Sequence, residues 1–305
     1  MYKRGKILVR PAIILTIAGS DSGAGAGIQA DVKSISANGG YAVTVITAIT
    51  AQNTKGVQNI FPISSKLVKD QLCSIFADFK VDAVKIGMLH NAEIVKTVAD
   101  TLEKYKPKFV VFDPVMVSSS GDILTEKDSI STMIERLFPL CSLVTPNFDE
   151  TVSIILASRM NKSNEIQENV KLKNSNFLQT IKDNACKISK LGAASILITG
   201  VCIENFNDEE KTISTDNFFD VLFSNNQFSF FGKPKILSKN THGTGCSLSS
   251  SIATNLAFGE NIVNAVNISQ KYVHECILSA KNLEIGQGNG PINHFFLANS
   301  VKILS

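Results

Sequence analysis

The sequence has no uninterrupted apolar run that approaches the ~20 residues of a membrane-spanning helix, so we expect no membrane partner. It also has no long basic run, and its formal net charge is only +3. This argues against nucleic acid as the main partner, because phosphate backbones select strongly basic surfaces. Residues 1–11 are basic but lack the apolar core and cleavage site of a secretory signal, so we interpret them as a frayed extension, with a remnant of a transit sequence as the alternative.

The cysteines do not form a CxxC pair or any other zinc-binding spacing. They are Cys73, Cys141, Cys186, Cys202, Cys246 and Cys276. A chain of 305 residues with 44% apolar and 19% charged residues can bury a sizeable core, and it does not need disulfides to fold. We therefore expect reduced, mostly buried thiols and a cytoplasmic protein, with Cys246 as the exception because glycines precede it.

The sequence has no internal repeat, and short apolar runs alternate with longer amphipathic ones. This alternation predicts an α/β fold, with parallel strands joined by right-handed crossovers and helices on both faces of the sheet. Ligands bind such sheets beyond the carboxyl ends of the strands. The informative residues at these predicted ends are Gly19–Asp21, Gly87–Met88, Asp113–Val115, Asn147–Glu150 and Thr199–Gly200.

Two stretches interrupt the alternation. Residues 159–176 are rich in Asn and Lys and poor in apolar residues, so we expect a polar loop insertion. Residues 203–232 are acidic first and then hold two aromatic-rich runs on either side of Asn225 and Asn226, which predicts a β-hairpin at a sheet edge or a flap. Neither stretch is typical of a linker, so we expect one domain over residues 1–305.

A first glycine-rich loop follows the first predicted strand. Gly23, Gly25 and Gly27 give GxGxG rather than GxGxxG, and no acidic residue ends the next strand, which disfavours a dinucleotide site. Asp31 lies in the first turns of the following helix. It either interacts favourably with the helix dipole or faces a polar ligand, and spacing leaves both open.

A second glycine turn, THGTGCS, is the stronger candidate for an anion site. The sequence has no Walker A motif and no protein-kinase signature, so a nucleotide site must be built differently. Gly243 and Gly245 flank Thr244, and the amides up to Cys246 can converge at a helix N-terminus, where the dipole favours an anion. Lys239, just before this turn, is a candidate phosphate partner.

The segment TPNFDE has two readings. Asn147 as N-cap with Glu150 three residues later matches a capping box, which is purely structural. Together with Asp113 at the end of a neighbouring strand, the same residues could hold Mg²⁺ through waters, because Mg²⁺ takes few direct protein oxygen ligands. The sequence leaves both readings open.

The combination of motifs resembles a known family. AGSDSGAGAGIQAD, TAQNTKGVQ, KIGML, DPVM, TPNxxE and NTHGTGC occur in this order. Together they resemble the hydroxymethylpyrimidine/phosphomethylpyrimidine kinases of thiamine biosynthesis, in the ribokinase-like superfamily. The similarity runs from about Ile13 to about Phe296. It implies a three-layer α/β/α domain, a homodimer, ATP and Mg²⁺, and two successive phosphorylations of a small pyrimidine alcohol at one site.

The resemblance also implies roles for individual residues. Gln52 matches the glutamine that reads the pyrimidine, and Glu150 matches the metal position. The other substrate positions are Ala18, Asp31, Met88 and Val115. Asp113 and Asn147, with Glu150, match the Mg²⁺–phosphate region. Thr199, Lys239 and Thr241 are further candidate nucleotide positions, without a family match. The anion hole and catalytic positions are Gly243, Thr244, Gly245 and Cys246. The sequence departs from the family at Ala24, which replaces a glycine, and at Thr199, where the family often has lysine.

Alternative functions stay open. Pyridoxal kinase is the nearest, although the Gln52 amide matches an aminopyrimidine edge by hydrogen bonding. Sugar kinases of this superfamily are less compatible, because they carry aspartate where Cys246 stands. A catalytically silent binding protein, or nucleophilic chemistry by Cys246 paired with His242, are further alternatives. For Cys246 we expect a pKa lowered by the helix N-terminus, and a smaller contribution to the rate than that of the backbone turn.

Overall fold

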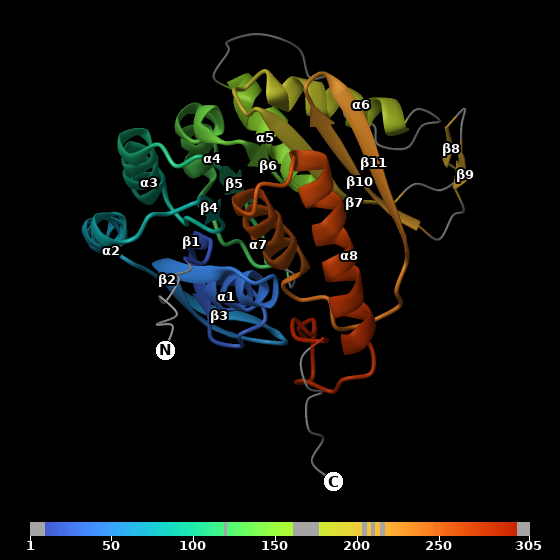
Figure 1. Cartoon of the computed structure of the whole chain (residues 1–305), viewed down its shortest axis with the longest axis horizontal. Helices are drawn as coiled ribbons and strands as arrows, with labels where there is room; N and C mark the ends of the chain where they lie inside the picture. Colours follow the sequence, from blue (N-terminus) through green and yellow to red (C-terminus); the bar gives the residue numbers. More distant parts are fainter. Residues whose placement is uncertain are drawn as a thin grey trace, which may run out of the picture.

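The computed structural model describes residues 10–118, 121–160, 177–202, 206–208, 211–213 and 217–297 (Figure 1). In this part of the chain a nine-stranded sheet runs through the molecule. From edge to edge its strands are β11 (Gln227–Pro234), β10 (Asn217–Ser224), β7 (Ser195–Cys202), β6 (Leu143–Val144), β5 (Val110–Phe112), β4 (Ala83–Ile86), β1 (Ile13–Asp21), β2 (Tyr41–Asn53) and β3 (Gly56–Pro62). The inner strands from β7 to β2 are parallel, as predicted.

The edges of the sheet are antiparallel. The predicted hairpin is confirmed as β10 and β11, with Asn225 and Asn226 at φ of 51° and 60° in its two-residue turn. Asparagine tolerates this left-handed conformation, which a tight hairpin turn needs. At the other edge β3 pairs with β2. Strand β3 was not predicted from the sequence. A separate two-stranded sheet is formed by β8 (Phe206–Asp208) and β9 (Lys211–Ile213).

Helices cover both faces of the sheet, which confirms the three-layer expectation (Figure 1). One face carries α2 (Ser65–Asp78), α3 (Ala92–Tyr105), α4 (Lys127–Arg136), α5 (Phe148–Met160) and α6 (Phe177–Ser189). The other carries α1 (Gly27–Ala37), α7 (Thr244–Ala257) and α8 (Ile262–Ala280). A short 3₁₀ helix, Phe138–Leu140, follows α4.

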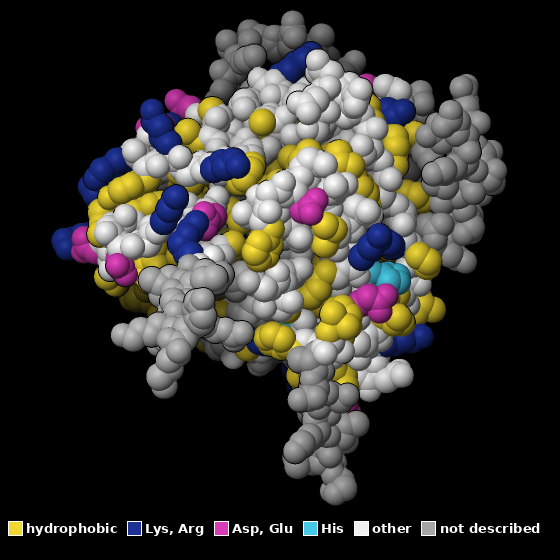
Figure 2. Space-filling model, viewed as in Figure 1, with side chains coloured by type: hydrophobic (Ala, Val, Ile, Leu, Met, Phe, Trp, Pro, Cys, Tyr) yellow, Lys and Arg dark blue, Asp and Glu magenta, His cyan; other side chains and the backbone are white. Residues whose placement is uncertain are grey.

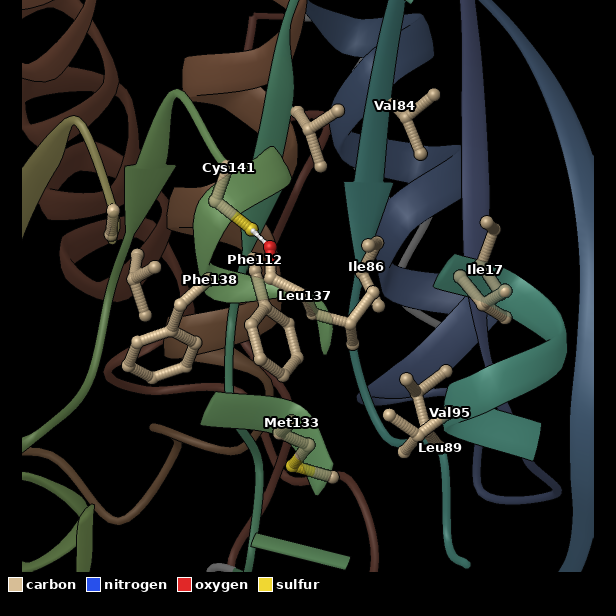
Figure 3. Close-up of a cluster of buried hydrophobic side chains, with 14 of the residues drawn as sticks. Ile17, Val84, Ile86, Leu89, Val95, Phe112, Met133, Leu137, Phe138 and Cys141 are labelled. Carbon is tan, nitrogen blue, oxygen red and sulfur yellow. Dashed lines mark hydrogen bonds between the residues drawn. The ribbon is translucent and has the colours of Figure 1, made fainter. Parts of the chain in front are cut away.

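The larger core lies under α2 to α6 (Figure 3). Phe112 of β5 meets Phe138 edge to face, with ring centroids 6.1 Å apart. Nearby, the Cys141 thiol donates a hydrogen bond of 3.1 Å to the carbonyl of Leu137. Cys141 and Cys276 are buried free thiols, as expected, whereas Cys73, Cys186 and Cys246 are free but only half-buried. The side chain of Cys202 lies outside the described part.

Some expectations need correction or lie outside the described residues. The predicted polar loop begins later than expected, because α5 continues through Arg159 to Met160; residues 161–176 are not described. Of the N-terminal extension only residues 10 and 11 are described. None of the described helices combines the length and apolar character needed to cross a membrane. On the face shown in Figure 2, Lys and Arg side chains are interspersed with apolar and acidic ones.

Candidate active site

A pocket of about 260 Å³ lies beyond the carboxyl ends of the parallel strands. All the site residues expected from the sequence line it, except Asp31 and Lys239. Those that line it are Ala18, Gln52, Met88, Asp113, Val115, Asn147, Glu150, Thr199, Thr241, Gly243, Thr244, Gly245 and Cys246. The pocket thus spans the sheet from β2 to β7, with the start of α7 beside it.

At the β1–β2 end the pocket has apolar walls and one amide. Ala18 and Met88 are 1% and 6% exposed, and Val115 lies beside them in the lining. The Gln52 side chain is half-buried; its Oε1 lies 3.1 Å from the Thr50 hydroxyl and its Nε2 3.4 Å from Nε2 of His242. A small flat ring with hydrogen-bonding groups on one edge fits these walls and this amide.

At the opposite end the capping box predicted at TPNFDE is present. Asn147 Oδ1 accepts from the amide of Glu150 at 2.9 Å, and Glu150 Oε2 accepts from the amide of Asn147 at 2.8 Å. The same residues line the pocket, so the structural and ligand-binding readings are compatible. Burial, together with the nearby Asp113, raises the pKa of Glu150 to about 8. Burial also raises the pKa of Asp113 to about 6, although Lys85 opposes the shift.

We expect Glu150→Gln to stabilise the ligand-free protein at pH 8 and to leave its stability unchanged at pH 4. The pKa of Glu150 is about 8 when folded against 4.5 for a free side chain, so ionisation removes stability as the pH rises between these values. Glutamine keeps an oxygen for the amide of Asn147. The expected gain at pH 8 is about 1–3 kcal/mol in the free energy of unfolding, measured with urea. A gain of equal size at both pH values would contradict this explanation.

The second glycine turn joins the two ends of the pocket. Gly243 has a φ of +84°, and a Cβ at this position would lie 1.8 Å from the carbonyl oxygen of Gly25, so only glycine fits. Helix α7 begins at Thr244, and its first amides, including those of Gly245 and Cys246, have no acceptor within the helix. A Cβ on Gly245 would lie 3.6 Å from Asp113, which places the acidic end next to this helix start. The arrangement suits an anion bound near a cation.

The pKa of Cys246 differs from the sequence-based expectation. We expected the helix N-terminus to lower it, but burial raises the pKa to about 12, with Asp31 and Asp113 raising it further and Lys85 opposing. The expectation of a lowered pKa is therefore wrong for the ligand-free protein. Cys246 is a neutral thiol at physiological pH, able to donate or accept a weak hydrogen bond.

The first glycine loop supports the second. The carboxylate of Asp21 accepts from the amides of Gly23, Gly25 and Ala26 at 2.8–3.0 Å, and it lies 2.9 Å from Nε2 of His242. These hydrogen bonds hold the pKa of Asp21 low although burial opposes them. A Cβ on Gly25 would clash with the His242 ring. His242 thus packs against the first loop.

Ala24, at the position where the resemblance predicts glycine, adopts a φ of +59°, which costs an alanine some strain. The sequence contained no local signal for the contact between Asp21 and His242, because 221 residues separate them.

Asp31 does not line the pocket, which corrects its expected position. Its side chain is fully buried and lies 2.8 and 2.9 Å from Nζ of Lys85, which is also fully buried. The hydroxyls of Thr16 and Ser250 donate to it at 2.6 and 2.8 Å. Burial opposes the charge on Lys85, yet the carboxylate raises its pKa. The role of Lys85 was not predicted from the sequence. Lys239 is exposed outside the pocket, so the structure does not bring it to the site.

The chain is similar to known proteins over most of its length. A family model described as phosphomethylpyrimidine kinase matches residues 21–293. The hydroxymethylpyrimidine/phosphomethylpyrimidine kinase of Rhizobium meliloti (strain 1021) is 40% identical over 284 residues, which is 93% of this chain and 97% of that protein. The chain spans about half the length of other curated relatives: it covers 53% of the thiamine biosynthesis bifunctional protein ThiED of Geobacter sulfurreducens, at 40% identity over 95% of this chain.

Solved structures share the fold. The phosphomethylpyrimidine kinase of Clostridium difficile 630 superposes with a TM-score of 0.68 at 36% identity, covering 87% of this chain and 99% of that one. The Bacillus subtilis pyridoxal kinase, in an ADP complex, has a TM-score of 0.77 at 29% identity, covering 94% and 99%. These neighbours confirm the ribokinase-like fold. Because the family model matches most of the sequence, the chain belongs to the phosphomethylpyrimidine kinase family.

Proposed function

We propose that this protein is an ATP-dependent kinase that phosphorylates 4-amino-5-hydroxymethyl-2-methylpyrimidine and then its monophosphate, in thiamine biosynthesis. The observation that carries this proposal is that one pocket holds both an apolar end with the Gln52 amide and a glycine turn at a helix N-terminus. The ring lies against Gln52 and Met88, and its hydroxymethyl group is directed toward Cys246. The activities named for the Rhizobium relative support the same assignment.

In this mechanism the backbone amides at the start of α7 provide most of the rate enhancement. The amides at the start of α7 receive the oxygens of the transferred phosphoryl group, whose loose transition state needs positioning and charge stabilisation more than a strong base. Cys246, as a neutral thiol, orients the substrate hydroxyl by a hydrogen bond. Gly243 gives the turn its shape, and the first loop holds that shape through Asp21 and His242.

The acidic end of the pocket fits Mg²⁺. Among the described residues no group of three or more His, Cys, Asp or Glu side chains could hold a metal alone. Mg²⁺ suits such a site, because it takes one or two carboxylates and completes its shell with waters and substrate phosphates. Glu150 and Asp113, with Asn147 beside them, would hold the ion, and burial together with Asp113 raises the pKa of Glu150. The ion would neutralise phosphate charge.

A pyridoxal kinase is the second candidate, supported by the structural similarity to the Bacillus subtilis enzyme. Gln52 favours the pyrimidine, because its half-buried amide would be covered by a bound ring, and an amide that the wrong ring covers and leaves unpaired costs ~1–3 kcal/mol. The test is ATP consumption with hydroxymethylpyrimidine, its monophosphate and pyridoxal measured side by side. We expect both pyrimidines to be turned over with a higher kcat/KM than pyridoxal. Turnover of pyridoxal alone would refute the main assignment.

The quaternary state and the location complete the proposal: a homodimer in the cytoplasm. The edge strand β3 and the neighbouring part of β2 expose Phe61 and Ile49, at 68% and 50%. An edge strand with exposed apolar side chains is a pairing surface, which supports self-association. Sedimentation equilibrium at micromolar concentration would contradict the dimer if it gave only the monomer mass.

A further inference from the structure

Asp220 in β10 is an acidic side chain that the proposed reaction does not use. Its Oδ1 accepts a hydrogen bond of 2.8 Å from the amide of Gly200, and its Oδ2 accepts from the side-chain amide of Gln270 in α8. None of the ion pairs within the described ranges involves it. Burial raises the pKa of Asp220 to about 6. A carboxylate whose hydrogen-bond donors are all amides is costly to ionise, so we ask which structural role of Asp220 offsets this cost.

This role follows from the pairing of β7 with β10. Phe219 pairs with Val201 and Val221 pairs with Ile198, so Thr199 and Gly200 together oppose Asp220. This is a β-bulge, a feature that re-aims side chains next to active sites. Gly200 has a φ of +68°, and no atom lies within 4 Å of where its Cβ would be, so the backbone conformation and not crowding selects glycine. Asp220 holds the amide that the bulge turns out of the strand.

The bulge is tied to the acidic end of the pocket on its other side. The amide of Thr199 donates to the carbonyl of Pro146 at 3.0 Å, and Thr199 forms an isolated parallel bridge with Asn147. Thr199 itself lines the pocket. Hydrogen bonds therefore connect the bulge to Asp220 on one side and to Pro146 on the other, and the next residue, Asn147, caps α5 together with Glu150.

The order of the strands indicates which of the two substrates, the pyrimidine or the phosphate donor, binds next to this bulge. Gln52 in β2 lies at one end of the pocket, Thr199 in β7 at the other, and the start of α7 next to Asp113 between them. On the proposed function, the ring binds at Gln52 and the phosphoryl group is transferred at the turn. The rest of the phosphate donor must then extend toward β6 and β7. We propose that Asp220 is a positioning residue for the nucleotide, which holds the Thr199–Gly200 bulge against the bound donor.

The test compares two substitutions of Asp220. Asp220→Ala removes the acceptor for the amide of Gly200, and we expect the KM for ATP to rise about tenfold, with the KM for the pyrimidine within about twofold of wild type. Asp220→Asn keeps this acceptor. The Oε1 of Gln270, which is buried without a hydrogen-bond partner, can turn to accept from the new amide. We therefore expect asparagine to restore the KM for ATP to within about threefold of wild type.

Ser224→Ala is the matched control. It removes the 2.9 Å hydrogen bond between Ser195 and Ser224, which joins the same two strands at the end away from the pocket, and we expect both KM values to stay at the wild-type level. Three results would overturn the proposal: an unchanged KM for ATP in Asp220→Ala, an equal rise in both KM values, or an asparagine variant as impaired as the alanine variant.

Calorimetric titration with ADP separates this inference from the proposed function, because it needs no turnover. A wild-type protein that binds ADP but phosphorylates no pyrimidine would refute the function, while the ADP affinities of the variants would still test Asp220. If Asp220→Ala does not fold, Gly200→Ala replaces it, since this substitution strains the same bulge without a clash. A weaker ADP affinity in Gly200→Ala supports the proposal, and a wild-type affinity overturns it.

Discussion

Replacing Gly243 by alanine is expected to reduce kcat/KM by about 10³-fold, the larger end of what one oxyanion-type donor contributes. The new Cβ would lie 1.8 Å from the carbonyl oxygen of Gly25, and φ is +84°, so the turn must move away from the first loop. The amides at the start of α7 then lose their common direction. The measurement is steady-state kinetics with the pyrimidine and ATP, together with circular dichroism to verify folding.

Two comparisons make this prediction specific. Cys246→Ala and Cys246→Ser should cost only about 10- to 100-fold, because a neutral thiol supplies little of the general-base contribution. Gly259→Ala is the control for backbone strain, since Gly259 has a φ of +96°, open space around it and a position outside the pocket. It should cost about 1 kcal/mol of stability and leave kcat/KM unchanged. The ranking of backbone above thiol is refuted if either cysteine variant loses more activity than Gly243→Ala.

Replacing Lys85 by methionine should destabilise the protein by about 3–5 kcal/mol, because it leaves Asp31 as an unpaired buried charge. Both side chains of the pair are fully buried, so water cannot compensate. The double variant Lys85→Met with Asp31→Asn should recover most of this loss, since the asparagine oxygen can accept from one of the hydroxyls of Thr16 and Ser250 and its NH2 group can donate to the other. Urea unfolding of the two single variants and the double variant closes the cycle.

Lys66→Met serves as the surface control. Lys66 pairs with Asp70 one helical turn later, but the two side chains are 86% and 56% exposed. Such a pair is worth at most about 0.5 kcal/mol. A loss below 1 kcal/mol in Lys85→Met, or a double variant as unstable as the single one, would show that the buried pair does not stabilise the fold in the way described.

Most of the parallel sheet was predictable from the sequence. Buried strands such as β1 appear as continuous apolar runs because both of their faces are covered, and helices such as α3 show a regular amphipathic period. The hairpin of β10 and β11 was found through its asparagine pair. The edge strand β3 was missed, since only Gly56 among its residues is buried and its sequence lacks a clear alternation.

The sequence by itself determined which residues stand at the strand ends and which form the glycine turn. Both features depend on residues that are close together in the chain. Only the tertiary structure decided what each ionisable group faces. Asp31 is paired with Lys85 beneath the pocket rather than with a ligand, and Asp21 reaches His242 across the fold. The pKa of Cys246 was likewise decided by burial rather than by the helix start that its sequence position suggested. Burial and charge pairing depend on residues that are distant in sequence, and packing alone brings them together.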